Sequence, residues 1–253
     1  MAKVAKWEIT PPPNGLLLVD KEPGMTSHDV VAKARHQLKT KKIGHCGTLD
    51  PMATGLLMLV VGKATKLQDK LMADQKEYLA TMKLGQTTSS QDKESDIEEE
   101  REVPDFSKED IDASFSKYMG KFAQIPPMVS AIKKDGVRLY KLARQGKEVP
   151  RDPRPVEVFE YEVSRFETPE VDFRVVCSKG FYVRTYAHDI GQDLGCGSHL
   201  TALRRTRSGI FTTEKAITVS DLKQTEREAL IERMVSLEEI LELIHDPEES
   251  KEG

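Results

Sequence analysis

Short runs of hydrophobic residues recur along the chain, and their spacing changes from one segment to the next. Residues 15–20 and 56–61 are nearly all apolar and end at a turn or a glycine, which predicts buried strands. Residues 76–85 alternate between apolar and polar side chains and stop at a glycine, as half-buried strands do. Two further strands are predicted over residues 156–167 and 171–178.

Helical spacing replaces these patterns elsewhere. After a cap at Ser27, it predicts a helix with Val30, Val31, Ala34 and Leu38 buried, and a second helix over residues 108–122 with Ile111, Phe115, Tyr118 and Met119 on one stripe. A third helix, with Ala187, Ile190 and Leu194 buried, is predicted to end at Gly195. Seven apolar residues between 231 and 244 predict one or two closing helices. Residues 87–102 are polar and acidic without periodicity, which predicts a mobile surface loop.

Strands outnumber long helices in the middle of the chain and do not alternate regularly with them. We therefore expect an α/β (α+β) fold, in which a mixed, mostly antiparallel central sheet is flanked by helices. With 253 residues, of which 38% are hydrophobic, the chain can bury a sizeable core.

Composition adds expectations about location and redox state. No run reaches the roughly 18–20 apolar residues of a membrane span, and the N-terminus lacks the apolar core of a signal peptide, so we expect a cytoplasmic protein with no membrane contact. Three scattered cysteines are too few for a disulfide framework and are expected to be free thiols.

The net charge of −4 hides an uneven distribution. Residues 92–112 hold eleven acidic residues and three basic ones, and residues 221–253 hold eleven and four. The rest of the chain is therefore strongly basic, so a protein that is acidic overall can still present a surface for nucleic acid.

One stretch, residues 44–55, combines a stiff backbone with a single carboxylate. Its three glycines allow tight turns, while Pro51 fixes its own φ and biases Asp50 towards an extended conformation. An acid on a rigid loop beside a buried strand is a usual way to present a catalytic group. The alternative is an ordinary turn that begins at Asp50.

This stretch resembles the G-H-x-G-x-L-D-P-x-A-x-G signature of TruB-type tRNA pseudouridine synthases, with Cys46 and Thr48 at the variable positions. Further family motifs have counterparts in residues 20–27, 76–85, 124–133, 180–186 and 199–206. The similarity covers about residues 14–220. It implies the pseudouridine synthase fold and a reaction that detaches uracil from C1′ of its ribose and reattaches it through C5.

The resemblance implies three catalytic residues. Asp50 is the nucleophile or the base that begins glycosidic cleavage, and attack on the sugar, attack on the nucleobase and proton abstraction all stay open. Arg184 is its expected ion-pair partner, which keeps the carboxylate charged, although a purely structural salt bridge is an alternative. Tyr78 is expected to stack on the flipped uracil and to take the C5 proton.

Other side chains are expected to hold the flipped nucleotide. By resemblance, Tyr182 walls the opposite side of the uracil, His45 inserts into the RNA stack where the base has left, and Leu203 borders the pocket. Residues 124–155 resemble a hinged thumb insertion that closes over the tRNA loop, and residues 133–154 carry eight Lys or Arg against three acidic residues. Contact with nucleic acid is favoured over a merely solvated face, because solvated faces usually mix both signs of charge.

Basic residues of the thumb and of the other motifs are expected to contact the RNA backbone. They are Lys21, Lys41, Lys42, Lys133, Lys134, Arg138, Lys141, Arg144, Arg204 and Arg205. Neither a metal nor a cofactor is expected, since Cys196 and His199 lack a second pair of ligands and the sequence contains no nucleotide-binding fingerprint.

The implied function is isomerisation of uridine 55 in the T-loop of tRNA by a monomer that binds the T stem-loop. The alternatives are a pseudouridine synthase for another RNA, a non-catalytic tRNA-binding or folding module, and an unrelated hydrolase with an aspartate nucleophile. We expect a flexible segment over residues 1–13, a catalytic domain over 14–220, and a helical segment with an acidic tail over 221–253. That last segment is too short for the PUA domain found in many family members.

Overall fold

The computed structural model describes residues 13–72, 75–130, 133–134, 137–138 and 149–245. Its strands are β1 Gly15–Lys21, β2 Ile43–Cys46, β3 Thr54–Val61, β4 Lys76–Leu84, β5 Gln86–Thr88, β6 Ile97–Glu100, β7 Gly120–Gln124, β8 Lys133–Lys134, β9 Val137–Arg138, β10 Arg154–Glu167, β11 Glu170–Cys177, β12 Ser198–Ser208, β13 Phe211–Thr212, β14 Ile217–Thr218 and β15 Val235–Ser236. The strands predicted over 15–20, 56–61, 76–85, 156–167 and 171–178 are thereby confirmed as β1, β3, β4, β10 and β11.

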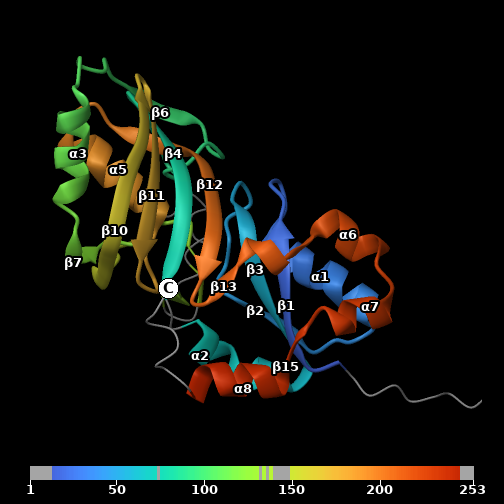
Figure 1. Ribbon diagram of the computed structural model, residues 1–253. Coiled ribbons are helices and arrows are strands. Elements are labelled where there is room, and N and C mark those ends of the chain that lie inside the picture. Colours follow the sequence, from blue (N-terminus) through green and yellow to red (C-terminus); the bar gives the residue numbers. More distant parts are fainter. Residues whose placement is uncertain (1–12, 73–74, 131–132, 135–136, 139–148, 246–253) are drawn as a thin grey trace, which may run out of the picture.

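The helices flank this framework. They are α1 Ser27–Leu38, α2 Gln68–Leu71, α3 Lys108–Ser116, α5 Val183–Asp193, α6 Val219–Gln224, α7 Arg227–Glu232 and α8 Leu237–His245, with 3-10 turns η1 Gly62–Leu67 and η2 Thr213–Lys215. Figure 1 shows α3 and α5 beside the half of the sheet that contains β10, β11 and β4, whereas α1, α6 and α7 gather beside β1. Within the described residues, no helix has the length and apolar character needed to cross a membrane.

One large sheet runs through the molecule in the order β14-β1-β3-β12-β4-β11-β10-β7, with β2 beside β3, β13 beside β12 and β15 beside β1. Its pairs are antiparallel except for β1 with β14 and β3 with β12. The predicted mixed, mostly antiparallel sheet with flanking helices is confirmed. β2, β7, β12, β13, β14 and β15 were not predicted. The short strands β14 and β15 join the chain after residue 216 to β1 near the start of the sequence.

The contact between β3 and β12 depends on one glycine. Gly55 has a φ of +95°, and a Cβ at this position would lie 2.2 Å from the carbonyl oxygen of Arg205 on β12. A side chain there would force the two strands apart. The loop with Asp50, which we call the signature loop, leads directly into β3, and β12 carries Leu203 and Arg205. This close approach therefore places residues from the two halves of the sheet next to each other.

The core confirms most of the predicted helix positions, and two details differ. Val30, Val31, Ala34 and Leu38 of α1 are buried, but the cap is Thr26, whose hydroxyl accepts a hydrogen bond from Asp29 N at 3.1 Å. The helix predicted over 108–122 ends at Ser116, because the chain turns into β7 at Gly120, where φ is +77°. Met119 therefore lies outside the helix and is exposed.

Residues 87–102 are not the loose surface loop that their composition predicts. They begin and end in the hairpin of β5 and β6, and between these strands Ser90 and Asp92 are buried. The hydroxyl of Thr88 donates to the carbonyl of Asp92 at 2.6 Å, and Leu200 N on β12 donates to the carbonyl of Gln91 at 3.1 Å. Hydrogen bonds of this kind, within the loop and to the distant strand β12, leave no periodic signal in the sequence.

Candidate active site

The loop that carries Asp50 connects β2 to β3 and is held from several sides. Ala53 N donates to the carbonyl of Asp50 at 3.1 Å and closes a turn with proline at its second position, a residue that this turn favours. The Ser27 hydroxyl accepts from Leu49 N at 2.9 Å and donates to Leu49 O at 3.1 Å. The residue before the aspartate is thus fixed to the start of α1, which restricts where the carboxylate can point.

Lys21 holds the same loop, and its predicted contact with the RNA backbone is wrong. The side chain is fully buried, and its Nζ donates to the carbonyls of Pro51 at 3.1 Å, Met25 at 2.7 Å and Glu22 at 3.0 Å. Burial lowers the pKa of its ammonium group to about 8. Buried and hydrogen-bonded to three carbonyls, this lysine stabilises the loop and is not exposed to a phosphate at the surface.

Asp50 forms a two-point ion pair with Arg184 in the first turn of α5, as the resemblance implies. Arg184 Nε lies 2.8 Å from Asp50 Oδ2, and Nη2 donates to Oδ1 at 3.1 Å. The arginine side chain is 2% exposed and the aspartate side chain is 30% exposed. The carboxylate therefore opens towards solvent from one side, while its cationic partner is enclosed.

Further acceptors surround the guanidinium of Arg184. Nη1 donates to Ser90 O at 2.7 Å, Nη2 donates to Val129 O at 2.8 Å, and Nε lies 3.6 Å from the carboxylate of Asp92. Asp92 accepts in turn from the Ser90 hydroxyl at 2.6 Å. The acidic loop between β5 and β6 thus fixes Arg184, a role that sequence reasoning missed because Asp92 stands among other acids in a segment without periodicity.

The environment of Asp50 acts on its pKa in opposite directions. Removal from water raises the pKa of the carboxyl above its usual value, the positive charge of Arg184 lowers it, and the nearby carboxylate of Asp92 raises it. Without Arg184 the ionised form would be disfavoured still further. The pair therefore keeps a carboxylate available as a nucleophile or base in a partly dry site.

Asp50 and Arg184 open on a pocket of about 230 Å³. This volume lies below the roughly 300–1,000 Å³ of sites for drug-sized molecules and suits a group the size of a nucleobase. The pocket is lined by Gly47, Thr48, Leu49, Asp50, Met72, Lys76, Tyr78, Ser130, Lys179, Gly180, Phe181, Tyr182, Val183, Arg184, Leu203 and Arg205. Four residues predicted to act in catalysis or to hold the flipped base, Tyr78, Tyr182, Arg184 and Leu203, thus line the same pocket as Asp50.

Tyr182 is positioned by a glutamine of the segment that leads into the thumb. Gln124 is 1% exposed at the end of β7, and its side-chain amide accepts from Tyr182 N at 2.8 Å and donates to Tyr182 O at 3.1 Å. Tyr182 is also the residue immediately before α5, so the same two hydrogen bonds, which we call the Gln124 clamp, fix the start of the helix that carries Arg184. This was not anticipated, although Gln124 begins a family motif.

His45 is not among the residues that line this pocket. It lies on β2, and its ring is perpendicular to that of His28 at a centroid distance of 6.0 Å. The carbonyl of His45 accepts from the side chain of Gln68 at 3.1 Å. Its insertion into an RNA stack stays a prediction.

The basic residues predicted for the RNA backbone fall into distinct groups. Lys41 and Lys42 are exposed, whereas Arg204 donates to both carboxylate oxygens of Asp20 at 3.0 and 2.7 Å. Arg205 is 1% exposed and lines the pocket, and its contact with the RNA backbone stays a prediction. In the thumb, Lys133, Lys134 and Arg138 belong to β8 and β9 with side chains that are not described, and Lys141 and Arg144 lie outside the described residues.

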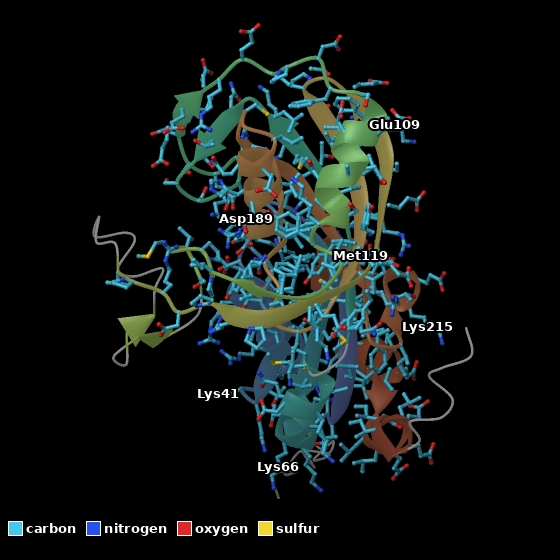
Figure 2. All side chains as sticks on the ribbon, turned by 90° about the vertical axis from the view of Figure 1, so that its left-hand side faces the viewer. Lys41, Lys66, Glu109, Met119, Asp189 and Lys215 are labelled. Carbon is cyan, nitrogen blue, oxygen red and sulfur yellow. The ribbon has the colours of Figure 1, made fainter. Side chains whose placement is uncertain are left out.

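Two further lysines, which sequence reasoning did not single out, lie next to Lys42. Gly62 N donates to Lys42 O at 2.8 Å, so the loop before β2 lies beside η1, where Lys63 and Lys66 are exposed. Figure 2 shows Lys41 and Lys66 at the same end of the molecule, opposite Glu109. We call Lys41, Lys42, Lys63 and Lys66 the basic edge.

The fold and the pocket define a pseudouridylate synthase, and the comparisons with known proteins agree. The N-terminal domain model of the TruB family of pseudouridylate synthases matches residues 35–183. The model of the C-terminal domain of tRNA pseudouridylate synthase B matches residues 184–249. The chain belongs to the TruB family.

Relatives and solved structures extend this result. The chain is 51% identical over 210 residues to tRNA pseudouridine synthase B of Opitutus terrae, covering 83% of this chain and 87% of the relative, and 46% identical over 228 residues to that of Syntrophotalea carbinolica, covering 90% and 74%. It also resembles a chain in the crystal structure of a Cbf5-Nop10-Gar1 complex, with a TM-score of 0.71 and 32% identity. That match covers 91% of this chain and 62% of the other.

Proposed function

We propose that this protein isomerises a uridine in the T-loop of tRNA, uridine 55, to pseudouridine. The observation that carries the proposal is the two-point ion pair of Asp50 and Arg184, which opens on a base-sized pocket between Tyr78 and Tyr182. The relatives named tRNA pseudouridine synthase B support tRNA as the substrate.

The chemistry follows from what the reaction requires. The target base must leave the RNA stack, which costs a few kcal/mol, and the aromatic faces of Tyr78 and Tyr182 can return part of this through stacking. Asp50 in its ionised form begins cleavage of the bond between C1′ and N1. After uracil has turned and joined C1′ through C5, Tyr78 takes the hydrogen from C5 as a proton. Since every atom stays on the substrate or exchanges with water, the proposal includes no cofactor.

RNA binding is assigned to surfaces outside the pocket. The basic edge offers four exposed lysines, and thumb residues 133–154 carry eight Lys or Arg. Phosphates bind to any well-placed cluster of cations, and the affinity then falls steeply with salt. His45 is proposed to fill the gap left by the flipped base. We propose that the protein works as a monomer in the cytoplasm.

The test uses tRNA transcripts that carry tritium at C5 of uracil, because only isomerisation exchanges this hydrogen. The wild-type protein should release tritium from tRNA and from an isolated T stem-loop, up to one equivalent per molecule. A transcript in which cytidine replaces uridine 55 should release none. Release that persists from this transcript would show that another uridine is the target, and the absence of release from any tRNA would favour the non-catalytic RNA-binding alternative.

A further inference from the structure

Arg205 is a buried cation to which the proposed reaction gives no role. Its Nε donates to Leu56 O at 2.8 Å and its Nη2 to Gly47 O at 3.2 Å, and the side chain is 1% exposed. Within the described part of the chain no carboxylate forms an ion pair with it, whereas Arg184 has Asp50 and Arg204 has Asp20. Two carbonyls do not neutralise a positive charge, and an uncompensated buried charge is costly. Such a charge beside a pocket is a candidate for a functional role.

The strand register places Arg205 opposite Tyr78. The two residues are partners in the antiparallel pair of β12 and β4, and both line the pocket. Next to them the register shifts, because Thr206 is an extra residue between the partners of Tyr78 and Glu77. Bulges of this kind redirect side chains and are frequent beside active sites. Both neighbours of Arg205, Arg204 and Thr206, have side chains engaged elsewhere, with Asp20 and with Glu77.

Three ionisable groups on elements around Tyr78 act on the pKa of its phenol. They are Arg205 on β12, Cys177 on β11 and Asp50 on the loop between β2 and β3. Burial raises the pKa of the Tyr78 phenol, and Cys177 and Asp50 raise it further. Arg205 opposes this rise through its positive charge. Of the three groups, it alone favours the phenolate.

We propose that Arg205 is a positioning residue for Tyr78, which fixes the hydroxyl in the pocket and supplies the positive charge that balances the phenolate as it removes the hydrogen from C5. This inference rests on the proposed function. In this step the phenolate oxygen takes the proton, the electrons of the C5–H bond form the C5–C6 double bond, and the electrons of the N1–C6 double bond return to N1, which takes a proton from water. The neutral phenol then returns its proton to water.

The first experiment measures the phenol without any turnover. The chain has six tyrosines, so the titration of Tyr78 is the ultraviolet absorbance of tyrosinate in a protein minus that of the same protein with Tyr78→Phe. Arg205→Met should move this titration to higher pH. Arg207→Met removes a charge from the same strand at a partly exposed position and should leave the titration unchanged. An unchanged Tyr78 titration in Arg205→Met would overturn the proposal.

The second experiment measures the reaction. In Arg205→Met, tritium release at saturating T stem-loop RNA should slow by roughly 10- to 100-fold, as expected for impaired proton transfer, while the Kd for the RNA and its salt dependence stay unchanged. The loss should shrink at alkaline pH, and 3-fluorotyrosine at position 78, whose phenol is more acidic, should restore part of the rate. A weaker Kd with a normal maximal rate would instead return Arg205 to RNA binding and overturn the proposal.

Two controls separate the possible failures. If Tyr78→Phe releases tritium at the wild-type rate, the assignment of Tyr78 in the proposed function fails, yet the titration still reports whether Arg205 favours the phenolate. If Arg205→Met does not fold, as judged by its thermal unfolding, Arg205→Lys carries the same tests. Lysine keeps the charge but cannot reproduce all the hydrogen bonds of the guanidinium, so its titration should shift less and its rate should respond to 3-fluorotyrosine in the same direction.

Discussion

Two groups of charged side chains differ in their exposure to solvent and in their partners. At the pocket, the side chains of Arg184 and Asp92 are buried and that of Asp50 is 30% exposed, and the ion-pair distances from Arg184 to the two carboxylates are 2.8 and 3.6 Å. At the basic edge the four lysines are exposed, and in the part of the chain that the structure describes none of them has an ion-pair partner. The first group is fixed before the substrate arrives, whereas the second group is in contact with water and salt.

Buried and exposed charges suit different tasks, chemistry in the pocket and binding at the surface. A buried charge is retained only with fixed partners, and in return it acts at low effective dielectric constant with little reorganisation. An exposed charge costs little and attracts phosphates, but salt screens it. Substitutions of Asp50, Arg184 or Asp92 should therefore change the rate at saturating RNA, and substitutions at the basic edge should change the affinity for RNA.

Among the residues that support Asp50 or bind RNA, the largest effect is expected for Arg184→Met. Without the guanidinium, Asp50 and Asp92 face each other as carboxylates in a buried site, so we expect the single-turnover rate of tritium release to fall by at least about 1,000-fold. Loss of one partner of a buried pair also destabilises a protein by roughly 3–5 kcal/mol. Thermal unfolding must therefore be measured alongside the rate.

Arg174→Met is the matched control for this substitution. Arg174 pairs with Glu77 at 3.0 Å and Glu160 at 2.8 Å, away from the pocket, and its loss should leave the rate unchanged. The pH profile sharpens the comparison. Burial raises the pKa of Asp50 and Arg184 lowers it, so the active carboxylate is lost as the pH falls. Any remaining activity of Arg184→Met should have its acid limb at higher pH than the wild type, and an unmoved limb would contradict the role of the pair.

The next largest effect is expected for Asp92→Asn. This change keeps the size of the side chain and its hydrogen bond from Ser90, but it removes a charge that lies 3.6 Å from Arg184. We expect the rate to fall by roughly 10- to 100-fold, because Arg184 keeps its direct bonds to Asp50 and loses only part of its support. Asp172→Asn, in an ion pair with Arg165 on the exposed side of β11, should have no effect on the rate. Equal effects of both changes would remove the special role of the acidic loop.

A smaller effect is expected for Gln124→Leu. It leaves the backbone N–H of Tyr182 without its partner, which costs about 1–3 kcal/mol. It also removes one of the two hydrogen bonds to the carbonyl of Tyr182, which still accepts from Tyr186 N at 3.0 Å. We expect the rate to fall about tenfold, as judged from single-turnover tritium release, because both Tyr182 and the start of α5 lose their clamp. Gln37→Leu breaks a similar bridge to the carbonyls of Lys223 and Thr225, far from the pocket, and should lower stability without changing the rate.

The smallest effect on the maximal rate is expected at the basic edge. Replacing Lys41, Lys42, Lys63 and Lys66 by glutamine should leave release at saturating RNA within about twofold of the wild type. The plot of log affinity against log salt should flatten by about 0.7–0.9 for each phosphate that the protein no longer neutralises. A filter-binding titration over several salt concentrations measures this slope. An unaltered slope would mean that these lysines are solvated charges only.

Local patterns were enough to predict the kind of sheet and five of the eleven strands that it has within the described residues. Strand periodicity located β1, β3, β4, β10 and β11, and the resemblance brought Asp50, Tyr78 and Arg184 together. Both kinds of signal are contained in short segments of sequence.

What could not be predicted depends on burial, which a basic or acidic residue type does not reveal. Lys21 and Arg205 are cations in motifs of a tRNA enzyme family, so RNA contact was the natural interpretation, yet both side chains bind backbone carbonyls in the interior. The same holds for Asp92, whose buried place follows from its contacts with distant strands. Only the three-dimensional structure distinguishes a charge that faces RNA from one that supports the site.

In the proposed reaction the carboxylate of Asp50, held by buried Arg184, begins cleavage of the bond between C1′ and N1. The most direct test compares single-turnover release of C5 tritium by the wild type and by Asp50→Asn, at equal and saturating occupancy of the T stem-loop RNA. Asparagine keeps the shape of the side chain and removes its charge, so we predict no detectable release with a Kd for RNA within a few-fold of the wild type. Release by Asp50→Asn within about tenfold of the wild-type rate would contradict the account.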